Sequence, residues 1–143
     1  MSNTSRHARN WITALLIALP CLASCSNAFV MKIDGDVNHS VTFRFFEAAA
    51  DAQPSRQDIV EFVVQEQDAG GQWLTAWELA GQQSLSSIQY GSAYEGLKQR
   101  AEAKPLVSNR HYRTLAKSRS MTSRGYASLE FSFDAQGKLI AQD

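Results

Sequence analysis

His39 and His111 are the residues of this sequence that could most readily act as general bases, since the third histidine, His7, lies in the N-terminal segment. A serine or cysteine hydrolase needs a nucleophile within hydrogen-bond reach of such a base. Neither histidine belongs to a recognisable catalytic motif, and the sequence contains no Gly-x-Ser-x-Gly, Ser-x-x-Lys or His-Glu-x-x-His pattern. We therefore predict that the protein is not an enzyme and has no catalytic residue and no cofactor.

An acidic run, Asp34-Gly35-Asp36-Val37-Asn38, matches the first half of a calcium-binding loop of the EF-hand type. The match ends there. The sixth position is His39, where that loop needs glycine, and the twelfth is Phe45, where it needs a bidentate glutamate. The spacing favours a tight acidic turn between two strands, and we predict no metal site.

The N-terminal segment has the order of a bacterial export signal. Positive charges at Arg6 and Arg9 precede an apolar run of 12 residues from Trp11 to Leu22. A membrane-spanning helix needs about 20 apolar residues, so this run is too short to cross a bilayer, and Pro20 interrupts it.

The next motif, Leu22-Ala23-Ser24-Cys25, resembles the lipobox of bacterial lipoproteins, in which a branched apolar residue and two small residues precede a cysteine. The resemblance implies removal of residues 1–24 as a signal peptide, a diacylglycerol on the Cys25 sulfur and acylation of the new amino group. Two or three acyl chains, at about 0.8 kcal/mol per buried methylene, make such attachment effectively permanent. Ser26 stands where aspartate would retain such a protein in the inner membrane, which implies the periplasmic face of the outer membrane. An ordinary signal peptide is the alternative.

The remaining residues, 25–143, are predicted to form one domain. They number 119, which is enough for a single hydrophobic core and too few for two domains. Cys25 is the one cysteine among them, so no internal disulfide is expected and core packing must stabilise the fold.

Short segments of alternating polarity, separated by turn signals, predict an all-β fold. In the clearest segment, Tyr126–Phe133, apolar residues alternate with small or polar ones, and Asp134–Gly137 then turns the chain into a closing strand, Lys138–Ala141. We expect an antiparallel β-sandwich of seven or eight short strands, immunoglobulin-like or transthyretin-like, with a small barrel as the alternative. The other expected strands are Phe29–Ile33, Val41–Phe45, Ile59–Glu66, Trp73–Ala80, Leu85–Tyr90 and His111–Lys117.

The sequence also contains two tryptophans on one expected strand and one long connection between strands. Trp73 and Trp77 are expected to share one face of their strand with Thr75, with at least one of them in the core. The connection from Gly91 to Asn109 is long for a compact domain, so it is either functional or partly helical, with two or three helical turns across Ala93–Ala103.

Positive charge is concentrated in residues 98–124. This segment contains eight lysines and arginines and one acidic residue, Glu102, whereas the rest of residues 25–143 contains four basic and 13 acidic residues. Such a segment could contact anionic lipid, lipopolysaccharide, peptidoglycan or an acidic protein. The alternative is that the strand His111–Lys117 pairs its charges with acidic neighbours in the sheet. Nucleic acid is not expected as a partner of an exported protein.

Several segments also resemble a known group of proteins. Ile88–Gly91, Glu95–Leu97 and Lys104–Leu106, together with Tyr112 and the Phe131–Ile140 hairpin, resemble small periplasmic lipoproteins of Gram-negative bacteria, including immunity lipoproteins linked to type VI secretion. The resemblance implies a binding role without identifying the partner.

We therefore predict a lipid-anchored periplasmic binding protein that docks an envelope or secretion-related protein. Tyr90 and Tyr94 flank Gly91, and exposed tyrosines on loops often anchor partners, although they also fill strand ends. The alternative function is a structural envelope lipoprotein that contacts lipopolysaccharide or peptidoglycan through a basic face. The predicted partner-binding residues are Tyr90, Tyr94, Lys98, Arg100, Arg110 and Arg113.

Overall fold

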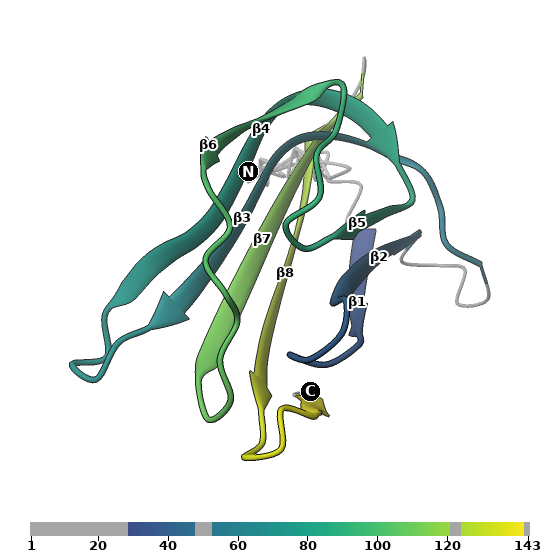
Figure 1. Ribbon diagram of the computed structural model, residues 1–143. Helices are drawn as coiled ribbons and strands as arrows, with labels where there is room; N and C mark the ends of the chain where they lie inside the picture. The colour runs from purple at the N-terminus through teal and green to yellow at the C-terminus, as the bar shows by residue number, and fades with distance from the viewer. Residues whose placement is uncertain (1–28, 48–52, 121–123, 142–143) are drawn as a thin grey trace, which may run out of the picture.

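The structure is a computed structural model that describes residues 29–47, 53–120 and 124–141 (Figure 1). These ranges contain nine β-strands and no helix, which confirms the predicted antiparallel β-sandwich, with slightly more strands than expected. In the same ranges no helix is long and apolar enough to cross a membrane. The lipobox and Cys25 lie outside the described residues.

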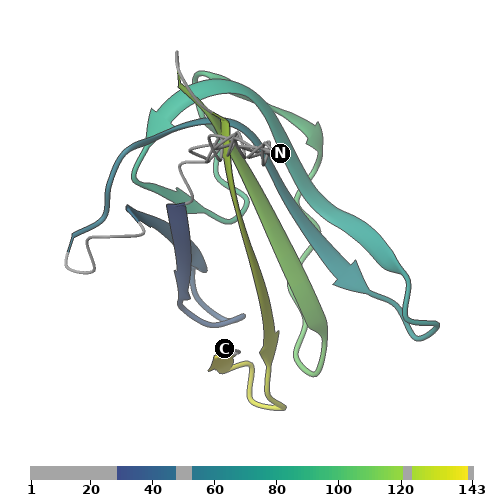
Figure 2. The ribbon, with the colours of Figure 1, turned by 180° about the vertical axis from the view of Figure 1, so that it is seen from behind.

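The strands form two antiparallel sheets that pack face to face (Figures 1 and 2). The small sheet has the strand order β1-β2-β5, and the large sheet has the order β6-β4-β3-β7-β8-β9. The strands are β1 (Phe29–Asp34), β2 (Thr42–Glu47), β3 (Gln57–Gln67), β4 (Trp73–Leu85), β5 (Ser87–Gln89), β6 (Leu97–Ala101), β7 (His111–Arg119), β8 (Arg124–Phe133) and β9 (Leu139–Ala141).

Aromatic side chains fill the space between the sheets. Phe43 of β2 is fully buried, and its ring lies 5.1 Å from Phe62 of β3 and 5.7 Å from Phe131 of β8, with an edge-to-face geometry in both pairs. Tyr112 of β7 stacks on Phe131 at 5.3 Å. Because each such pair adds about 0.5–1.5 kcal/mol beyond the area it buries, the contacts of Phe43 with Phe62 and Phe131 are a main source of cohesion between the two sheets.

A β-bulge at Ala76 changes which side chains of β4 face the core. Val64 of β3 pairs with Trp77, whereas the next residue of β3 pairs with Thr75, which leaves Ala76 without a partner. Because side chains alternate along a strand, the extra residue places Trp77 in the core and Trp73 on the opposite face. The prediction that the two tryptophans share one face is therefore wrong, although one of them is indeed in the core.

The connection from Gly91 to Asn109 contains a strand where helical turns were expected across Ala93–Ala103. This strand is β6, which pairs with the edge of the large sheet formed by β4. Leu97 is its one fully buried side chain. The prediction of a helix is therefore wrong, because hydrogen bonding to a neighbouring strand decides the conformation of this segment.

The turns that follow β1 and β8 contact each other. The backbone N–H of Val37 donates to the carbonyl of Gly137 at 3.0 Å, and the side-chain amide of Asn38 donates to the carbonyl of Gln136 at 3.4 Å. The predicted turn after β8 is confirmed, since Asp134 accepts hydrogen bonds from two of the backbone N–H groups that follow it and Gly137 has a φ of 81°. The last residues of β1 and β8 therefore lie at one end of the sandwich.

Candidate binding face

The small sheet covers one face of the large sheet, and no second layer of described residues covers the other (Figures 1 and 2). On β7, Tyr112, Thr114 and Ala116 are buried, and the residues between them point outward. The outward residues of β7 and their partners on β8 form the centre of this uncovered surface, which we call the outer face. They are His111, Arg113, Leu115, Lys117 and Arg119 on β7, and Ser132, Glu130, Ser128, Tyr126 and Arg124 on β8.

One half of the outer face carries a group of side chains around Trp73, which we call the Trp73 cluster. The Arg113 guanidinium lies over the Trp73 ring, 4.5 Å from its centroid, and the His111 ring centroid lies 5.5 Å from that of Trp73. Arg113 Nε donates to Gln65 Oε1 at 2.7 Å, and His111 Nε2 lies 3.0 Å from Glu130 Oε2. The stack and the hydrogen bond hold the arginine in one position, so little side-chain entropy remains to be lost when a partner binds.

Two shallow cavities lie along the outer face and share Leu115. The first, of about 560 Å³, adjoins the Trp73 cluster and is also lined by Gln65, Arg113, Ser128 and Glu130. The second, of about 600 Å³, is lined by Val60, Lys117, Arg119, Arg124 and Tyr126 among others. Both volumes fall within the range of about 300–1,000 Å³ that is typical of ligand sites, so each cavity can accept a protruding side chain or a small polar group.

The second cavity lies at an end of the sheet that we call the cationic end, defined by Lys117, Arg119, Arg124 and Tyr126. Arg119 and Arg124 are direct partners across the β7–β8 pairing, and Lys117 is the partner of Tyr126. Lys117 Nζ lies 2.9 Å from Glu61 Oε1, whereas neither arginine has an ion pair within the described part of the chain. Because like charges directly opposite each other destabilise a sheet, the two arginines favour an anion supplied from elsewhere.

The two tyrosines predicted to bind a partner attach the connection after β5 to the rest of the fold. The Tyr90 hydroxyl donates to the Lys104 carbonyl at 2.7 Å, and its ring packs edge to face on Trp77 at 5.0 Å. Burial raises the pKa of Tyr90 well above its usual value. The Tyr94 hydroxyl accepts a hydrogen bond from the Gln89 N–H at 2.7 Å. Both hydroxyls thus have partners inside the fold, and a role in partner binding stays a prediction.

The four basic residues predicted to bind a partner lie in three separate places. Lys98 and Arg100 are on β6 at one edge of the large sheet, Arg110 immediately precedes β7, and Arg113 is on the outer face. Since β4 and β3 separate β6 from β7, these residues do not form one cluster. Arg113 is the member of the predicted set that belongs to the Trp73 cluster.

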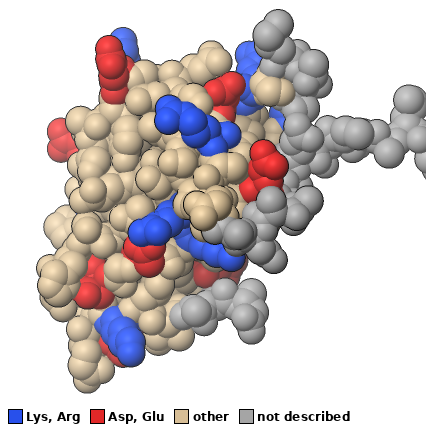
Figure 3. Space-filling view, turned by 90° about the vertical axis from the view of Figure 1, so that its right-hand side faces the viewer, with Lys and Arg blue, Asp and Glu red and all other residues tan. Residues whose placement is uncertain are grey.

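Three of the eight basic residues in 98–124, namely Arg100, Arg110 and Lys117, form ion pairs within the described part of the chain. Arg110 lies 3.4 Å from Glu66, and Arg100 lies 3.8 Å from Glu78. Within the strand His111–Lys117, both end residues contact carboxylates of neighbouring strands, as the predicted alternative of pairing within the sheet requires, whereas Arg113 contacts Gln65 and Trp73. On a different side of the molecule, which carries β1 and β2, Figure 3 shows positive and negative side chains next to one another. Exposed pairs of this kind contribute about 0–1 kcal/mol each, so they neutralise charge more than they stabilise the fold.

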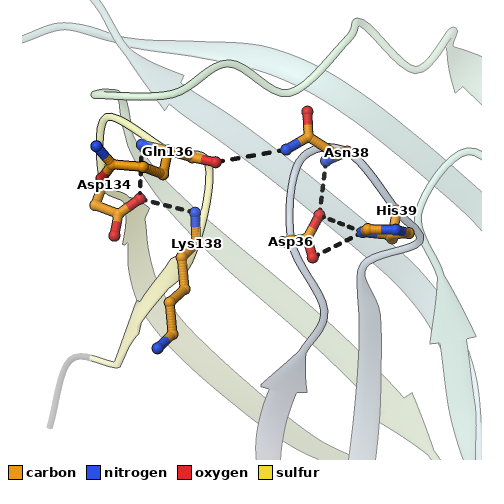
Figure 4. A network of polar contacts seen from close by, with 6 residues as sticks. All are labelled: Asp36, Asn38, His39, Asp134, Gln136 and Lys138. Carbon is orange, nitrogen blue, oxygen red and sulfur yellow. Dashed lines mark hydrogen bonds and ion pairs between the residues drawn. The ribbon is translucent and has the colours of Figure 1, made fainter.

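His39 is part of the turn that follows β1 (Figure 4). Its Nδ1 lies 2.8 Å from both carboxylate oxygens of Asp36, and one of those oxygens also accepts the Asn38 N–H at 2.8 Å. The hydrogen bond from His39 lowers the pKa of Asp36. The predicted tight acidic turn is confirmed, and its carboxylate serves to organise the turn. Among the described residues, no group of three or more potential metal ligands occurs.

Two parts of the outer face were not anticipated from the sequence. Tyr126 lies on the side of β8 opposite to the buried Ala127 and Phe131. The outward direction of its side chain could therefore have been inferred from the same pattern that predicted β8. The pairing of Arg119 with Arg124 depends on the register between two strands, which neither residue signals by itself.

Comparison of the chain with protein-family models, with curated proteins and with solved structures finds no match. The class of protein therefore rests on its fold and surface. It is an antiparallel β-sandwich whose uncovered outer face carries a fixed tryptophan–arginine stack in one half and a group of basic residues at the other end. Any function has to be argued from these two features and from the N-terminal motif.

Proposed function

We propose that the protein is a non-catalytic binding protein, anchored by lipid on Cys25 to the periplasmic face of the outer membrane, which docks an envelope or secretion-related protein through the Trp73 cluster. The observation that carries the proposal is the stack of Arg113 on Trp73, at 4.5 Å, beside a cavity of about 560 Å³. Tryptophan and arginine are, with tyrosine, the residue types most enriched at the energetic centres of protein interfaces. An arginine that is already held in place suits that role because binding does not have to order it.

The chemistry of the cluster favours a partner that presents a carboxylate next to an apolar side chain. Arg113 uses Nε to donate to Gln65, and no hydrogen bond or ion pair within the described chain occupies its two terminal nitrogens. Those nitrogens can bind a carboxylate, whose charge strengthens the hydrogen bonds. The neighbouring cavity reaches Leu115, which provides an apolar surface for an adjacent side chain of the partner.

Attachment through Cys25 is supported by the lipobox and by the short connection to the fold. Phe29 begins β1 four residues after Cys25, so their Cα atoms are at most about 14 Å apart. Lipid on Cys25 would hold the sandwich at the membrane surface and raise the local concentration of membrane-associated partners. Cys25→Ser should abolish lipid labelling and release the protein from the membrane, and continued labelling would contradict the anchor.

The docking surface is tested by a crosslinking pull-down from intact envelopes with two matched pairs of substitutions. One pair, Trp73→Ala with Arg113→Ala, removes the centre of the outer face. The other pair, Lys98→Glu with Arg100→Glu, changes the β6 edge. We expect the unaltered protein to retain one exported protein in near-equal amounts, the outer-face pair to lose it, and the β6 pair to keep it. Loss with the β6 pair alone would move the docking site to that edge.

A second candidate function is that of a structural envelope lipoprotein that contacts lipopolysaccharide or peptidoglycan through a basic face. Arg119 and Arg124 favour it, since they have no ion pair within the described residues and leave positive charge available at one end of the sheet. This function predicts recovery of envelope polymers without a protein partner, with recovery that declines as salt is raised. Recovery of a protein alone, independent of those polymers, contradicts it.

A further inference from the structure

The starts of β1 and β8 lie at the same end of the sandwich. The turns after the two strands are joined by the hydrogen bond from Val37 to Gly137, and the strands run side by side in the same direction (Figures 1 and 2). β1 has 6 residues and β8 has 10, so at about 3.3 Å per residue β8 extends roughly 13 Å beyond the start of β1. Arg124, the first residue of β8, therefore projects past Phe29 on the side from which the chain enters the fold.

The maximum length of the chain between Cys25 and Phe29 is similar to the length by which β8 extends beyond β1. The chain from Phe29 back to Cys25 spans at most about 14 Å, close to the roughly 13 Å by which β8 extends beyond β1. We infer that the cationic end lies against the membrane to which Cys25 is attached and binds the phosphate groups of anionic lipids. The inference rests on the proposed lipid anchor and adds to it an orientation and a second contact with the bilayer.

The side chains at this end suit a lipid headgroup. Arg119 and Arg124 have no ion pair within the described chain, so an external phosphate relieves the repulsion between them. Tyr126 is 66% exposed, and tyrosine is favoured where an apolar surface meets water and headgroups. The cavity between them is also lined by Val60 and Leu115, which can contact the apolar part of a lipid next to its phosphate.

The same orientation leaves the proposed docking site accessible. β7 runs from His111 to Arg119, so the Trp73 cluster and the cationic end lie at opposite ends of this strand, roughly 26 Å apart at about 3.3 Å per residue. With the cationic end on the membrane, Trp73 and Arg113 face the periplasm. A partner could therefore bind the outer face without displacing the protein from the lipid surface.

The orientation is tested with the full lipidated protein in vesicles of phosphatidylethanolamine and phosphatidylglycerol. An environment-sensitive fluorophore is attached either through Tyr126→Cys, which leaves the three basic residues in place, or through Ala135→Cys in the turn at the far end. Lipids that carry a quencher on the headgroup report how close each label lies to the membrane. Flotation with the vesicles reports the Cys25 anchor separately.

We expect headgroup lipids to quench the label at position 126 much more than the label at position 135. The difference should disappear at high salt and in vesicles of phosphatidylethanolamine and phosphatidylcholine alone. Each basic residue near an anionic surface changes affinity about fivefold, so reversal of both arginines, R119E with R124E, should reduce the membrane-contacting population by at least an order of magnitude. R119K with R124K should preserve it, because the attraction depends on charge. K104E with K138E, an equal change in net charge elsewhere, should also preserve it.

Three results would overturn the inference. Equal quenching at both positions, in protein that still floats with the vesicles, would refute the orientation and leave the anchor intact. Shielding of the label at position 126 in intact envelopes but not in protein-free vesicles would assign the cationic end to a protein partner. Failure to float would refute the anchor itself and, with it, the basis for the orientation.

Discussion

Trp73 and Trp77 are four residues apart on β4 and lie on opposite faces of the large sheet because Ala76 forms a bulge between them. Trp77 is fully buried, and its Nε1 donates to Gln99 Oε1 at 3.0 Å. Trp73 lies under the Arg113 guanidinium on the outer face. The bulge thus separates a residue that stabilises the fold from a residue that shapes the surface.

Substitution of the two tryptophans should separate stability from binding. Trp77→Ala should lower the free energy of unfolding by about 3–5 kcal/mol, because it leaves a cavity in the core and removes the partner of Gln99. Trp73→Ala should lower it by only about 1 kcal/mol or less, as is usual for partly exposed positions. Urea unfolding in a nonionic detergent, followed by far-ultraviolet circular dichroism, measures both values. If Trp77→Ala does not fold, Trp77→Phe should fold with an intermediate loss, and equal losses at positions 73 and 77 would contradict the assignment.

The parts of the fold that could be predicted from the sequence are strands with one buried face. β8 is the clearest, because Ala127, Phe131 and Phe133 are buried and alternate with exposed or half-buried residues. β6 could not be predicted, since Leu97 is its one buried side chain and the residues after it are compatible with a helix. Its conformation depends on hydrogen bonds to β4, a strand that is not adjacent to β6 in the sequence.

The candidate site was predictable only in part, for a related reason. Arg113 could be identified from the local density of positive charge. That density does not show that Lys117 pairs with Glu61 while Arg119 has no ion pair among the described residues. Such a distinction requires the register of three strands. The face on which Trp73 lies depends on a bulge, and a bulge leaves no mark in the alternation of residue types.

The turn after β8 should be sensitive to substitution of Gly137. Its φ of 81° lies in the left-handed region, and a Cβ atom at this position would collide with the Val37 side chain. Gly91 has a similar φ of 76°, but a Cβ atom there would meet Ala103 at an ordinary contact distance of 3.6 Å. Both changes to alanine should cost about 1–2 kcal/mol from the backbone alone, and Gly137→Ala should cost more because of the collision. Thermal unfolding measures the difference, and equal losses would show that Val37 moves aside.

Stability should fall at alkaline pH because Tyr90 is half-buried and stays neutral in the folded protein. Its pKa is raised above the ordinary value of 10.0, so above that pH the unfolded chain loses a proton that the folded chain keeps. The contribution of the neutral Tyr90 to the free energy of unfolding is therefore fully present below pH 10.0. It is lost as the pH rises through the higher pKa that Tyr90 has in the folded state. Tyr94 and Tyr112 are shifted in the same direction by burial.

Tyr90→Phe tests this linkage. It removes the hydrogen bonds to two backbone carbonyls and should lower the free energy of unfolding by about 0.5–1.5 kcal/mol at neutral pH. It should also make the alkaline decline shallower, without abolishing it, because Tyr94 and Tyr112 also have a raised pKa in the folded protein. Urea unfolding at neutral pH and at several values above the ordinary tyrosine pKa gives both quantities. Tyr126→Phe, at an exposed position, serves as the control, and an unchanged alkaline slope in Tyr90→Phe would contradict the linkage.

Arg124→Glu should stabilise the isolated protein while weakening its contact with the membrane. The substitution turns a like-charged pair with Arg119 into an oppositely charged one, which should raise the free energy of unfolding by about 0.2–1 kcal/mol. Lys138→Glu makes the same change in net charge without an opposing arginine and should give no such gain. Urea unfolding in a nonionic detergent measures the stability of both variants. The absence of any gain would show that the two arginines do not interact across the β7–β8 pairing.

Arg113→Lys should weaken partner binding although it keeps the positive charge. Lysine has no planar group to stack on Trp73. It also has a single side-chain nitrogen, whereas the Arg113 guanidinium donates to Gln65 through Nε and has two further nitrogens that can bind a partner. Affinity for the protein recovered from envelopes should therefore fall by on the order of tenfold, as expected when a central interface arginine is lost, with the free energy of unfolding changed by less than about 1 kcal/mol. Titration calorimetry with that protein measures the affinity, and Lys98→Ala, on β6 and separated from β7 by β4 and β3, should bind as the unaltered protein does. Equal affinity for Arg113→Lys would mean that the partner senses charge alone, and the proposal that the tryptophan–arginine stack forms the docking site would then fail.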